Sequence, residues 1–170
     1  MPRSHLVRDA LVKIGGFSEP PLAPILGCED PWFYRNKMEY SFSEATENRE
    51  EKEEDRGPKK LVLGLHEKKS FSRVFNLQEC FLESELSVKI LETVRSWTRE
   101  HALVAHDPRT GTGLLKNLIV REGKNTGEVM VNLVIAGREF SFDREFTALI
   151  SSAFPQVTSL FRTSVTIRKG

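Results

Sequence analysis

The side chains of this 170-residue sequence that could bind a metal or act as nucleophiles are mainly its cysteines and histidines. A zinc site needs about four ligands at short spacings. Cys28, Cys80, His66, His101 and His106 form no C-x-x-C or H-x-x-x-H pair, so we expect no intrinsic metal site. Cys80, in NLQECFLES, leaves two interpretations open: a small buried hydrophobe or a functional thiol.

Motifs for other chemistry are missing from the sequence. It has no Gly-rich phosphate loop, no G-x-S-x-G and no G-x-G-x-x-G after a strand. Glu39 and Glu67 would serve as general bases only if the fold brought them into one cleft, and surface carboxylates are the plainer interpretation. The residues themselves therefore predict no catalytic site.

A basic and polar set remains, placed on expected strands and turns. If those strands are neighbours, the set would form one face rich in phosphate donors. The alternative is an ordinary mixed-charge sheet face, and periodicity does not choose between the two. The set consists of Arg35, Asn36, Lys37, Lys68, Lys69, Arg73, Lys116, Asn117, Arg121, Lys124, Asn125 and Asn132.

Composition limits what these residues can mean. Lys+Arg 25 against Asp+Glu 24 gives a net charge of +1, so binding of nucleic acid would need a local basic face. The chain length predicts one domain, over residues 1–170. Two cysteines are too few for a disulfide framework, which favours the cytoplasm. Without an apolar run of about 18 residues or a signal peptide, we expect no membrane contact.

The elements that must position the polar set follow from periodicity. Ser4 is expected to cap a first helix that ends at Gly15 and Gly16, and prolines then keep the chain extended. A strand is expected over 33–43, with Tyr34, Met38, Tyr40 and Phe42 on its core face and Arg35 and Lys37 opposite. Asn36 would then be a polar residue pointing toward the core.

The remaining segments complete an α+β fold with a mainly antiparallel sheet and two or three packed helices. Residues 44–60 are expected to be a mobile charged loop, because Ala45 is its sole apolar residue. Strands over 61–67 and 70–76 would form a meander with the first strand. A helix over 84–101 begins after Ser84 and exposes Lys89, Glu92, Arg95 and Arg99. A hairpin turning at GKNTG, a helix over 143–153 and a last strand over 157–169 follow.

Five segments carry a resemblance to a known family. They are YRNKMEYSFS, LGLHEKKSF, LQECFLESELSVKILETVRSWTREHAL, DPRTGTGLLKNLIVREGKNTGEVMVNLV and, more weakly, VTSLFRTSV. In the same order, they resemble consecutive segments of the bacterial RNA 5-methyluridine methyltransferases, and LIVREGKNTGEVMVNLV is the most specific. The resemblance runs over nearly all of the chain and is to the central domain of that family.

The resemblance implies an S-adenosylmethionine-dependent RNA (uracil-5-)-methyltransferase that acts on rRNA or tRNA. In that family an N-terminal RNA-binding region, often with a 4Fe-4S cluster, precedes the central domain, and a C-terminal S-adenosylmethionine domain follows it. The family's cysteine nucleophile and cofactor loop match nothing in this sequence, so we expect no catalytic or cofactor-binding residue here and no methyl transfer by this chain alone. We expect it to be a monomer that supplies scaffold and RNA contact through Arg35, Lys37, Lys116, Arg121 and Lys124.

Cys80 gains a sharper interpretation from the same resemblance. It matches the fourth thiolate ligand of the 4Fe-4S cluster in family members whose other three cysteines lie upstream. The resemblance therefore implies that Cys80 would bind iron in a longer parent protein and that this chain alone would hold no cluster. An alternative function from another class is a naturally short, non-catalytic RNA-binding or interaction protein.

Overall fold

The computed structural model describes residues 3–45, 60–68, 70 and 73–166, and the chain divides into two compact units, Met1–Pro31 and Trp32–Gly170. In the first unit α1 (Arg3–Asp9) continues into the short π-helix η1 (Ala10–Ile14). Gly16, at φ 72°, follows it in the left-handed region that glycine tolerates best. The predicted helix and its glycine stop are confirmed, but Ser4 lies within α1 and not at its cap.

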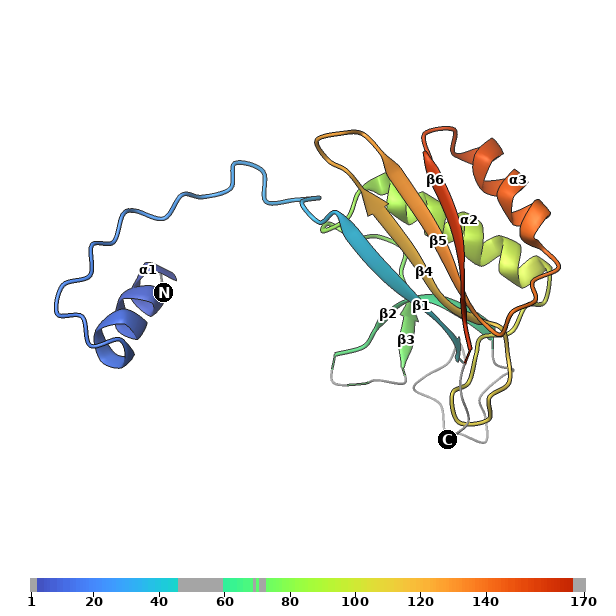
Figure 1. Cartoon of the computed structure of the whole chain (residues 1–170), viewed down its shortest axis with the longest axis horizontal. Coiled ribbons are helices and arrows are strands. Elements are labelled where there is room, and N and C mark those ends of the chain that lie inside the picture. The colour runs from blue at the N-terminus through green and yellow to red at the C-terminus, as the bar shows by residue number, and fades with distance from the viewer. Residues whose placement is uncertain (1–2, 46–59, 69, 71–72, 167–170) are drawn as a thin grey trace. The chain divides into compact units, whose positions relative to one another are not determined.

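The second unit is built on a six-stranded sheet with the order β3-β2-β1-β4-β5-β6 (Figure 1). The strands are β1 (Lys37–Ala45), β2 (Lys60–His66), β3 (Val74–Asn76), β4 (Leu115–Glu122), β5 (Val129–Ala136) and β6 (Ser159–Val165). All neighbouring pairs are antiparallel except β5 and β6, which are parallel. The predicted α+β fold with a mainly antiparallel sheet is therefore confirmed.

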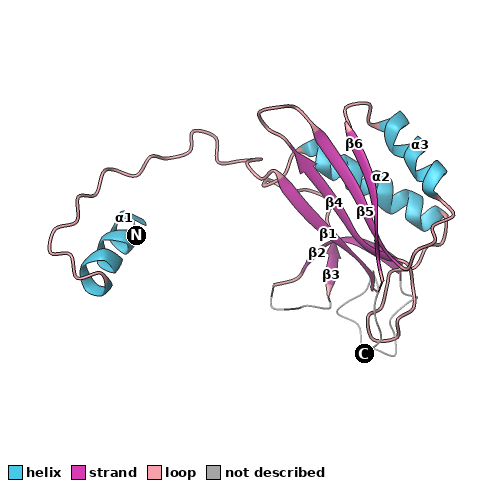
Figure 2. Cartoon of the chain, viewed as in Figure 1, coloured by secondary structure: helices cyan, strands magenta, loops and turns pink. Residues whose placement is uncertain are grey.

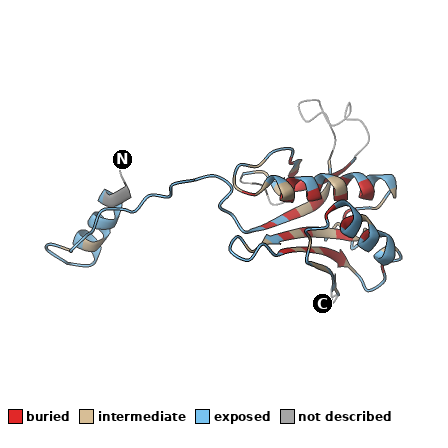
Figure 3. Ribbon diagram, turned by 90° about the horizontal axis from the view of Figure 1, so that it is seen from above, coloured by how far each residue is buried: buried red, intermediate tan, exposed pale blue. Residues whose placement is uncertain are grey.

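Two helices, α2 (Glu85–Glu100) and α3 (Asp143–Ala153), pack against this sheet. Ser84 caps α2 as predicted, because its side chain accepts a hydrogen bond of 3.1 Å from the backbone N–H of Ser87. Apolar residues of both helices share one core cluster with alternate residues of the strands. Figure 3 shows this buried layer between the helices and the sheet.

Helix α3 connects the two parallel strands. It begins and ends at the predicted residues, and Pro155 follows it. Its Phe146 and Ile150 are buried, and the ring of Phe146 lies 5.4 Å from that of Trp97 on α2. Burial of aromatic rings at this junction joins the two helices to the sheet. Neither α2, α3 nor another helix in the part of the chain that the structure describes is long and apolar enough to cross a membrane.

The start of β1 differs from the prediction. The strand begins at Lys37, and residues 33–35 contact the 81–82 segment instead: Phe33 N–H donates to Phe81 O and Arg35 N–H to Leu82 O, both at 2.8 Å. Tyr34 is consequently 63% exposed and not in the core. Asn36 is also exposed, so the prediction that its amide points toward the core is wrong.

Arg95 also differs from the prediction, because it is buried and not on the exposed side of α2. Its guanidinium donates to the backbone carbonyls of Leu77 at 2.8 Å and Leu63 at 3.3 Å. A long side chain can thus satisfy carbonyl groups at the sheet from a position that helical periodicity assigns to the surface.

Several predicted boundaries shift. Strand β3 covers 74–76 of the predicted 70–76, of which 71–72 lie outside the described residues. Strand β6 covers 159–165 of the predicted 157–169, of which 167–169 lie outside them as well. Of the charged loop predicted over 44–60, Glu44 and Ala45 belong to β1 and Lys60 to β2. Residues 46–59 lie outside the described residues.

Candidate nucleic-acid interface

The sheet has one face that α2 and α3 do not cover (Figure 2). Met38 and Tyr40 of β1 point into the core, so Lys37, Glu39 and Ser41 point the other way, because side chains alternate along a strand. The register pairs Lys37 with Arg121, Glu39 with Ile119 and Ser41 with Asn117. We call this side of β1, β4, β5 and β6 the open face.

Lys37 and Arg121 are therefore direct cross-strand partners on the open face. Both are exposed. Directly opposed side chains in antiparallel strands have Cβ atoms about 5 Å apart, and like charges at that distance repel. The Lys37 ammonium lies 3.8 Å from Glu39 Oε2, but both side chains of that ion pair are about half exposed, so the pair is weak.

Polar side chains continue across the open face. Asn117 Nδ2 donates to Ser41 Oγ at 3.2 Å, and Ser41 Oγ lies 3.0 Å from His66 Nε2, which links β4, β1 and β2. On the next strand pair, Thr163 Oγ1 donates to Asn132 Oδ1 at 3.1 Å. Hydroxyl, amide and imidazole groups of this kind contact phosphate, sugar and base edges in nucleic-acid complexes.

The open face also carries an exposed aromatic ring. Phe161 of β6 pairs with Asn132 and is 54% exposed. Ile119 and Met130, on β4 and β5, are half-buried in the same layer. An aromatic ring beside polar and cationic groups is the combination on which unstacked bases of single-stranded RNA are bound.

The other predicted RNA-contacting residues lie elsewhere. Arg35 and Lys124 both act electrostatically on the carboxyl group of Glu83, at the end of the sheet beside the α2 N-terminus. Lys124 Nζ is already paired with Glu122 Oε2 at 2.9 Å. Lys116 lies at the irregularity of the β4–β5 register between Leu115 and Asn117. The structure thus places Lys37 and Arg121 opposite each other, whereas Lys124 is held in an ion pair and Lys116 lies at the register irregularity.

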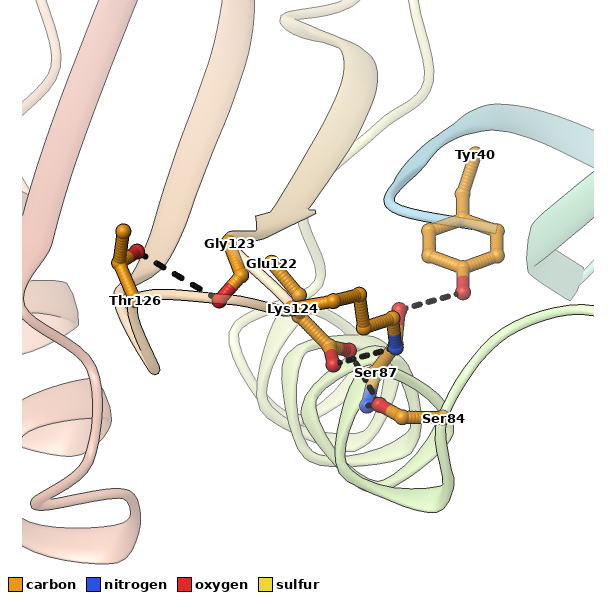
Figure 4. A network of polar contacts seen from close by, with 7 residues as sticks. All are labelled: Tyr40, Ser84, Ser87, Glu122, Gly123, Lys124 and Thr126. Carbon is orange, nitrogen blue, oxygen red and sulfur yellow. Dashed lines mark hydrogen bonds and ion pairs between the residues drawn. The ribbon is translucent and has the colours of Figure 1, made fainter. Parts of the chain in front are cut away.

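A carboxylate cluster at the α2 N-terminus was not predicted from the sequence. Figure 4 shows Ser84 and Lys124 converging on Glu122, with Tyr40 and Ser87 nearby. Ser84 Oγ donates to the Glu122 carboxylate, and the hydroxyls of Tyr40 and Ser87 lie 2.8 Å apart. Burial raises the pKa of Tyr40, so its hydroxyl stays protonated.

Glu83 is the unusual member of this cluster. It is fully buried, and neither of its carboxylate oxygens has a hydrogen-bond partner among the described residues. Burial, and secondarily the nearby Glu122, raise the pKa of Glu83 to about 7. The one signal in the sequence was its position directly before the Ser84 cap, which does not distinguish a buried carboxylate from an exposed one.

Cys80 lies half-buried in the segment before α2, and Cys28 is exposed in the first unit, where its Sγ donates to Asp30 O at 2.9 Å. A 4Fe-4S cluster normally takes four cysteine thiolates. Within the described ranges no group of three or more His, Cys, Asp or Glu side chains could hold a metal ion. The residues present therefore do not fit a cluster by themselves, and we assign no chemistry to one.

The fold and the open face define an α+β region whose sheet carries polar and cationic side chains on one surface. Comparison with known proteins narrows the class of protein to which this region is similar. No protein-family model matches the chain. A Bacteroides thetaiotaomicron protein named uncharacterized RNA methyltransferase is 33% identical over 159 residues, 91% of this chain and 35% of that protein. A Porphyromonas gingivalis protein of the same name is 32% identical over 93% of this chain and 35% of its own length.

A Chlorobaculum tepidum protein, also named as an uncharacterized RNA methyltransferase, is 29% identical over 96% of this chain and 34% of its own length. The predicted resemblance to RNA methyltransferases is thus confirmed: over most of its length the chain is homologous to proteins named RNA methyltransferases. The chain spans about a third of the length of these curated relatives.

A solved structure shares the fold. The tRNA (uracil-54, C5)-methyltransferase of Pyrococcus abyssi, determined in complex with S-adenosyl-L-homocysteine, superposes with a TM-score of 0.56 at 18% identity. The match covers 83% of this chain and 30% of that chain. At this identity the likeness concerns the fold.

Proposed function

We propose that this chain is the central, RNA-contacting region of an S-adenosylmethionine-dependent RNA (uracil-5-)-methyltransferase that acts on rRNA or tRNA. The names of its relatives and the activity of the structural neighbour support this proposal. In the proposal the chemical groups for methyl transfer belong to other parts of a longer protein. The open face would hold the RNA, and Cys80 would be a cluster ligand in such a parent.

One observation carries the RNA-contact proposal: two cations, Lys37 and Arg121, are opposed on the face of the sheet that α2 and α3 do not cover. A phosphate placed between two such cations gains attraction from both and relieves their mutual repulsion. Asn117, Ser41 and Asn132 would supply hydrogen bonds to sugar or base edges, and Phe161 would stack on an unpaired base.

The remaining predicted residues have secondary roles in this proposal. Arg35 is exposed near the end of β1 and could extend the phosphate path. Lys124 should contribute less, because its ion pair with Glu122 would have to be exchanged for one with phosphate. Lys116 is half-buried at the β4 irregularity and is not part of the open face. Its contact with RNA therefore stays a prediction.

Binding of fluorescently labelled rRNA and tRNA stem-loops to the chain tests the proposal. We expect weak binding that falls steeply between low and moderate salt, and weaker binding by Arg35→Ala. We also expect no incorporation of labelled methyl groups from S-adenosylmethionine into RNA by this chain alone. Affinity that is indifferent to salt would contradict RNA contact, and methyl transfer by the chain would contradict the assignment of the chemistry to other regions.

A further inference from the structure

Phe161 and Asn132 are neighbours on the open face, because the β5–β6 register pairs them directly. Paired residues on adjacent strands point to the same side of the sheet, and the strands lie about 4.8 Å apart. The Phe161 ring is 54% exposed, whereas Asn132 is half-buried beside it. A planar base that stacks on the Phe161 ring therefore brings its polar edge against the Asn132 amide.

The amide of Asn132 is held in one orientation. Thr163 lies two residues after Phe161 on the same side of β6, and its hydroxyl donates to Asn132 Oδ1 at 3.1 Å. This bond fixes which end of the amide is the acceptor. The one side-chain hydrogen bond of Asn132 within the described residues uses Oδ1, so the N–H groups of Nδ2 can donate to a ligand.

Donors of this kind distinguish keto bases from amino bases. Uracil carries a carbonyl oxygen at the edge where cytosine carries an amino group, and guanine and adenine differ from each other in the same way. An amino group that faces the Asn132 N–H groups leaves donors opposed and unpaired, which costs free energy. The fixed amide therefore favours uracil or guanine.

The surroundings of the pair suit a base of single-stranded RNA. Ile119 pairs with Asn132, and Met130 lies two residues before Asn132; both side chains are half-buried and offer apolar contact. Arg121, one of the two opposed cations, pairs with Met130, two strands and two residues away from Phe161. Strand spacing and rise make that separation about 12 Å. One short RNA segment can therefore contact both the cations and the ring.

We propose that Phe161 and Asn132 form a binding site for one unpaired keto base of RNA, uracil or guanine. The base stacks on the ring, and its carbonyl oxygen accepts a hydrogen bond from Asn132 Nδ2. This inference rests on the proposed RNA contact of the open face. The base is not the one that receives the methyl group, because the groups for that reaction belong to other regions in the proposed function.

Short RNAs that differ in one base test the proposal. Labelled heptanucleotides of sequence CCCXCCC, with uracil, cytosine, hypoxanthine or adenine at X, are titrated with the whole chain and followed by fluorescence anisotropy. Hypoxanthine keeps the carbonyl group of guanine and lacks its amino group. Uracil and cytosine are matched in size, as are hypoxanthine and adenine, and the keto member of each pair should bind about fivefold more tightly.

Variants separate the choice of base from general affinity. Asn132→Asp replaces the donor by acceptors and should reverse the preference in both pairs. Ser159→Asp adds the same charge on the same face and should weaken binding of all four RNAs while keeping the keto preference. Phe161→Leu should also weaken all four, because stacking tolerates every base.

A further variant tests the orientation of the amide without a change in charge. Thr163→Val removes the hydroxyl that fixes Asn132 and should reduce the keto preference. Asn132, Ser159, Phe161 and Thr163 lie outside the core cluster, and thermal melts check that each variant is folded.

The outcomes distinguish failure of this inference from failure of the proposed function. If the parent binds with salt-dependent affinity but equally to keto and amino bases, the base site is wrong and the RNA contact stands. The same holds if Asn132→Asp keeps the keto preference. If the parent binds none of the four RNAs at millimolar concentration, the RNA contact of the open face is wrong, and the base site with it.

Discussion

Lys37 of β1 and Arg121 of β4 stand directly opposite each other on the open face of the sheet. Directly opposed like charges destabilise a sheet by a few tenths of a kcal/mol to about 1 kcal/mol. Such a pair weakens the free protein slightly and favours any anion that can lie between the two cations. The proposed RNA contact therefore predicts measurable effects on stability as well as on binding.

Neutralising one member of this pair should stabilise the free protein. We expect Lys37→Thr to raise the free energy of unfolding by about 0.5 kcal/mol at low salt, because it removes the repulsion and threonine favours strands. Inorganic phosphate should then raise the melting temperature of the variant less than that of the parent. Urea denaturation and thermal melts measure both effects, and Lys89→Thr on α2 serves as the control. A phosphate effect of equal size in parent and variant would argue against an anion site at this pair.

Glu83 should make stability depend on pH. Its pKa is raised in the folded protein from an ordinary 4.5 to about 7, so the folded state holds this proton more tightly than the unfolded state does. The contribution of the Glu83 carboxyl group to the free energy of unfolding is therefore fully present below about pH 4.5 and is lost as the pH rises through 7.

The substitution Glu83→Gln should flatten this dependence and stabilise the protein at pH 8 by roughly 3 kcal/mol, since the pKa is raised from 4.5 to about 7 and one pKa unit corresponds to about 1.4 kcal/mol. Glu85→Gln, at the exposed first turn of α2, is the matched control and should leave the slope intact. Urea denaturation at pH 5 and pH 8 supplies the data. An unchanged slope in Glu83→Gln would show that another group carries the dependence.

The buried hydrogen bond between Tyr40 and Ser87 should couple β1 to α2. The two hydroxyls lie 2.8 Å apart, and both residues are fully buried. Tyr40→Phe and Ser87→Ala should each destabilise the protein by about 1 kcal/mol, since each leaves the other hydroxyl unpaired. The double variant should cost less than the sum of the two single costs. Additive costs in this double-mutant cycle would contradict a direct bond.

Arg95 should be needed for stability although it lies on a helix side predicted to be exposed. Arg95→Met should cost about 2 kcal/mol, because the carbonyls of Leu63 and Leu77 lose their charged donor. Lys89→Met, on the exposed side of the same helix, should change stability by less than about 0.5 kcal/mol. Comparable effects of the two substitutions in chemical denaturation would rule out the structural role of Arg95.

Periodicity alone predicted the parts of the fold in which one face is buried. The β4–β5 hairpin, α2 and α3 follow their apolar repeats because these elements bury one side against the core. The period-two pattern predicted the burial of Tyr34 and Asn36 wrongly, because the alternation of apolar and polar residues begins three residues before strand β1 does. Contacts of residues 33–35 with the 81–82 segment decide that stretch, and no local pattern encodes a contact between segments so far apart.

The candidate site was predictable in its residue types but not in its grouping. Alternation placed Lys37 on the polar face of its strand, and Arg121 belonged to the basic and polar set, but their pairing required the β1–β4 register, which depends on how the whole sheet assembles. Alternation also did not show that Arg121 would lie on the open face while Lys124 would be paired with Glu122. Phe161 and Glu83 were missed because exposure of a phenyl ring and burial of a carboxylate both run against the usual tendencies of those residues.

The salt dependence of RNA binding tests the central claim most directly. For the parent chain and for Lys37→Ala/Arg121→Ala, the logarithm of the association constant for a labelled RNA stem-loop is plotted against the logarithm of salt concentration. We predict that the double variant lowers the magnitude of the slope by about 1 to 2, since each lost phosphate contact removes about 0.7 to 0.9. Arg138→Ala/Arg144→Ala, with the same change in net charge away from the open face, should leave the slope close to that of the parent. Equal slopes for the parent and Lys37→Ala/Arg121→Ala would contradict the proposed RNA contact.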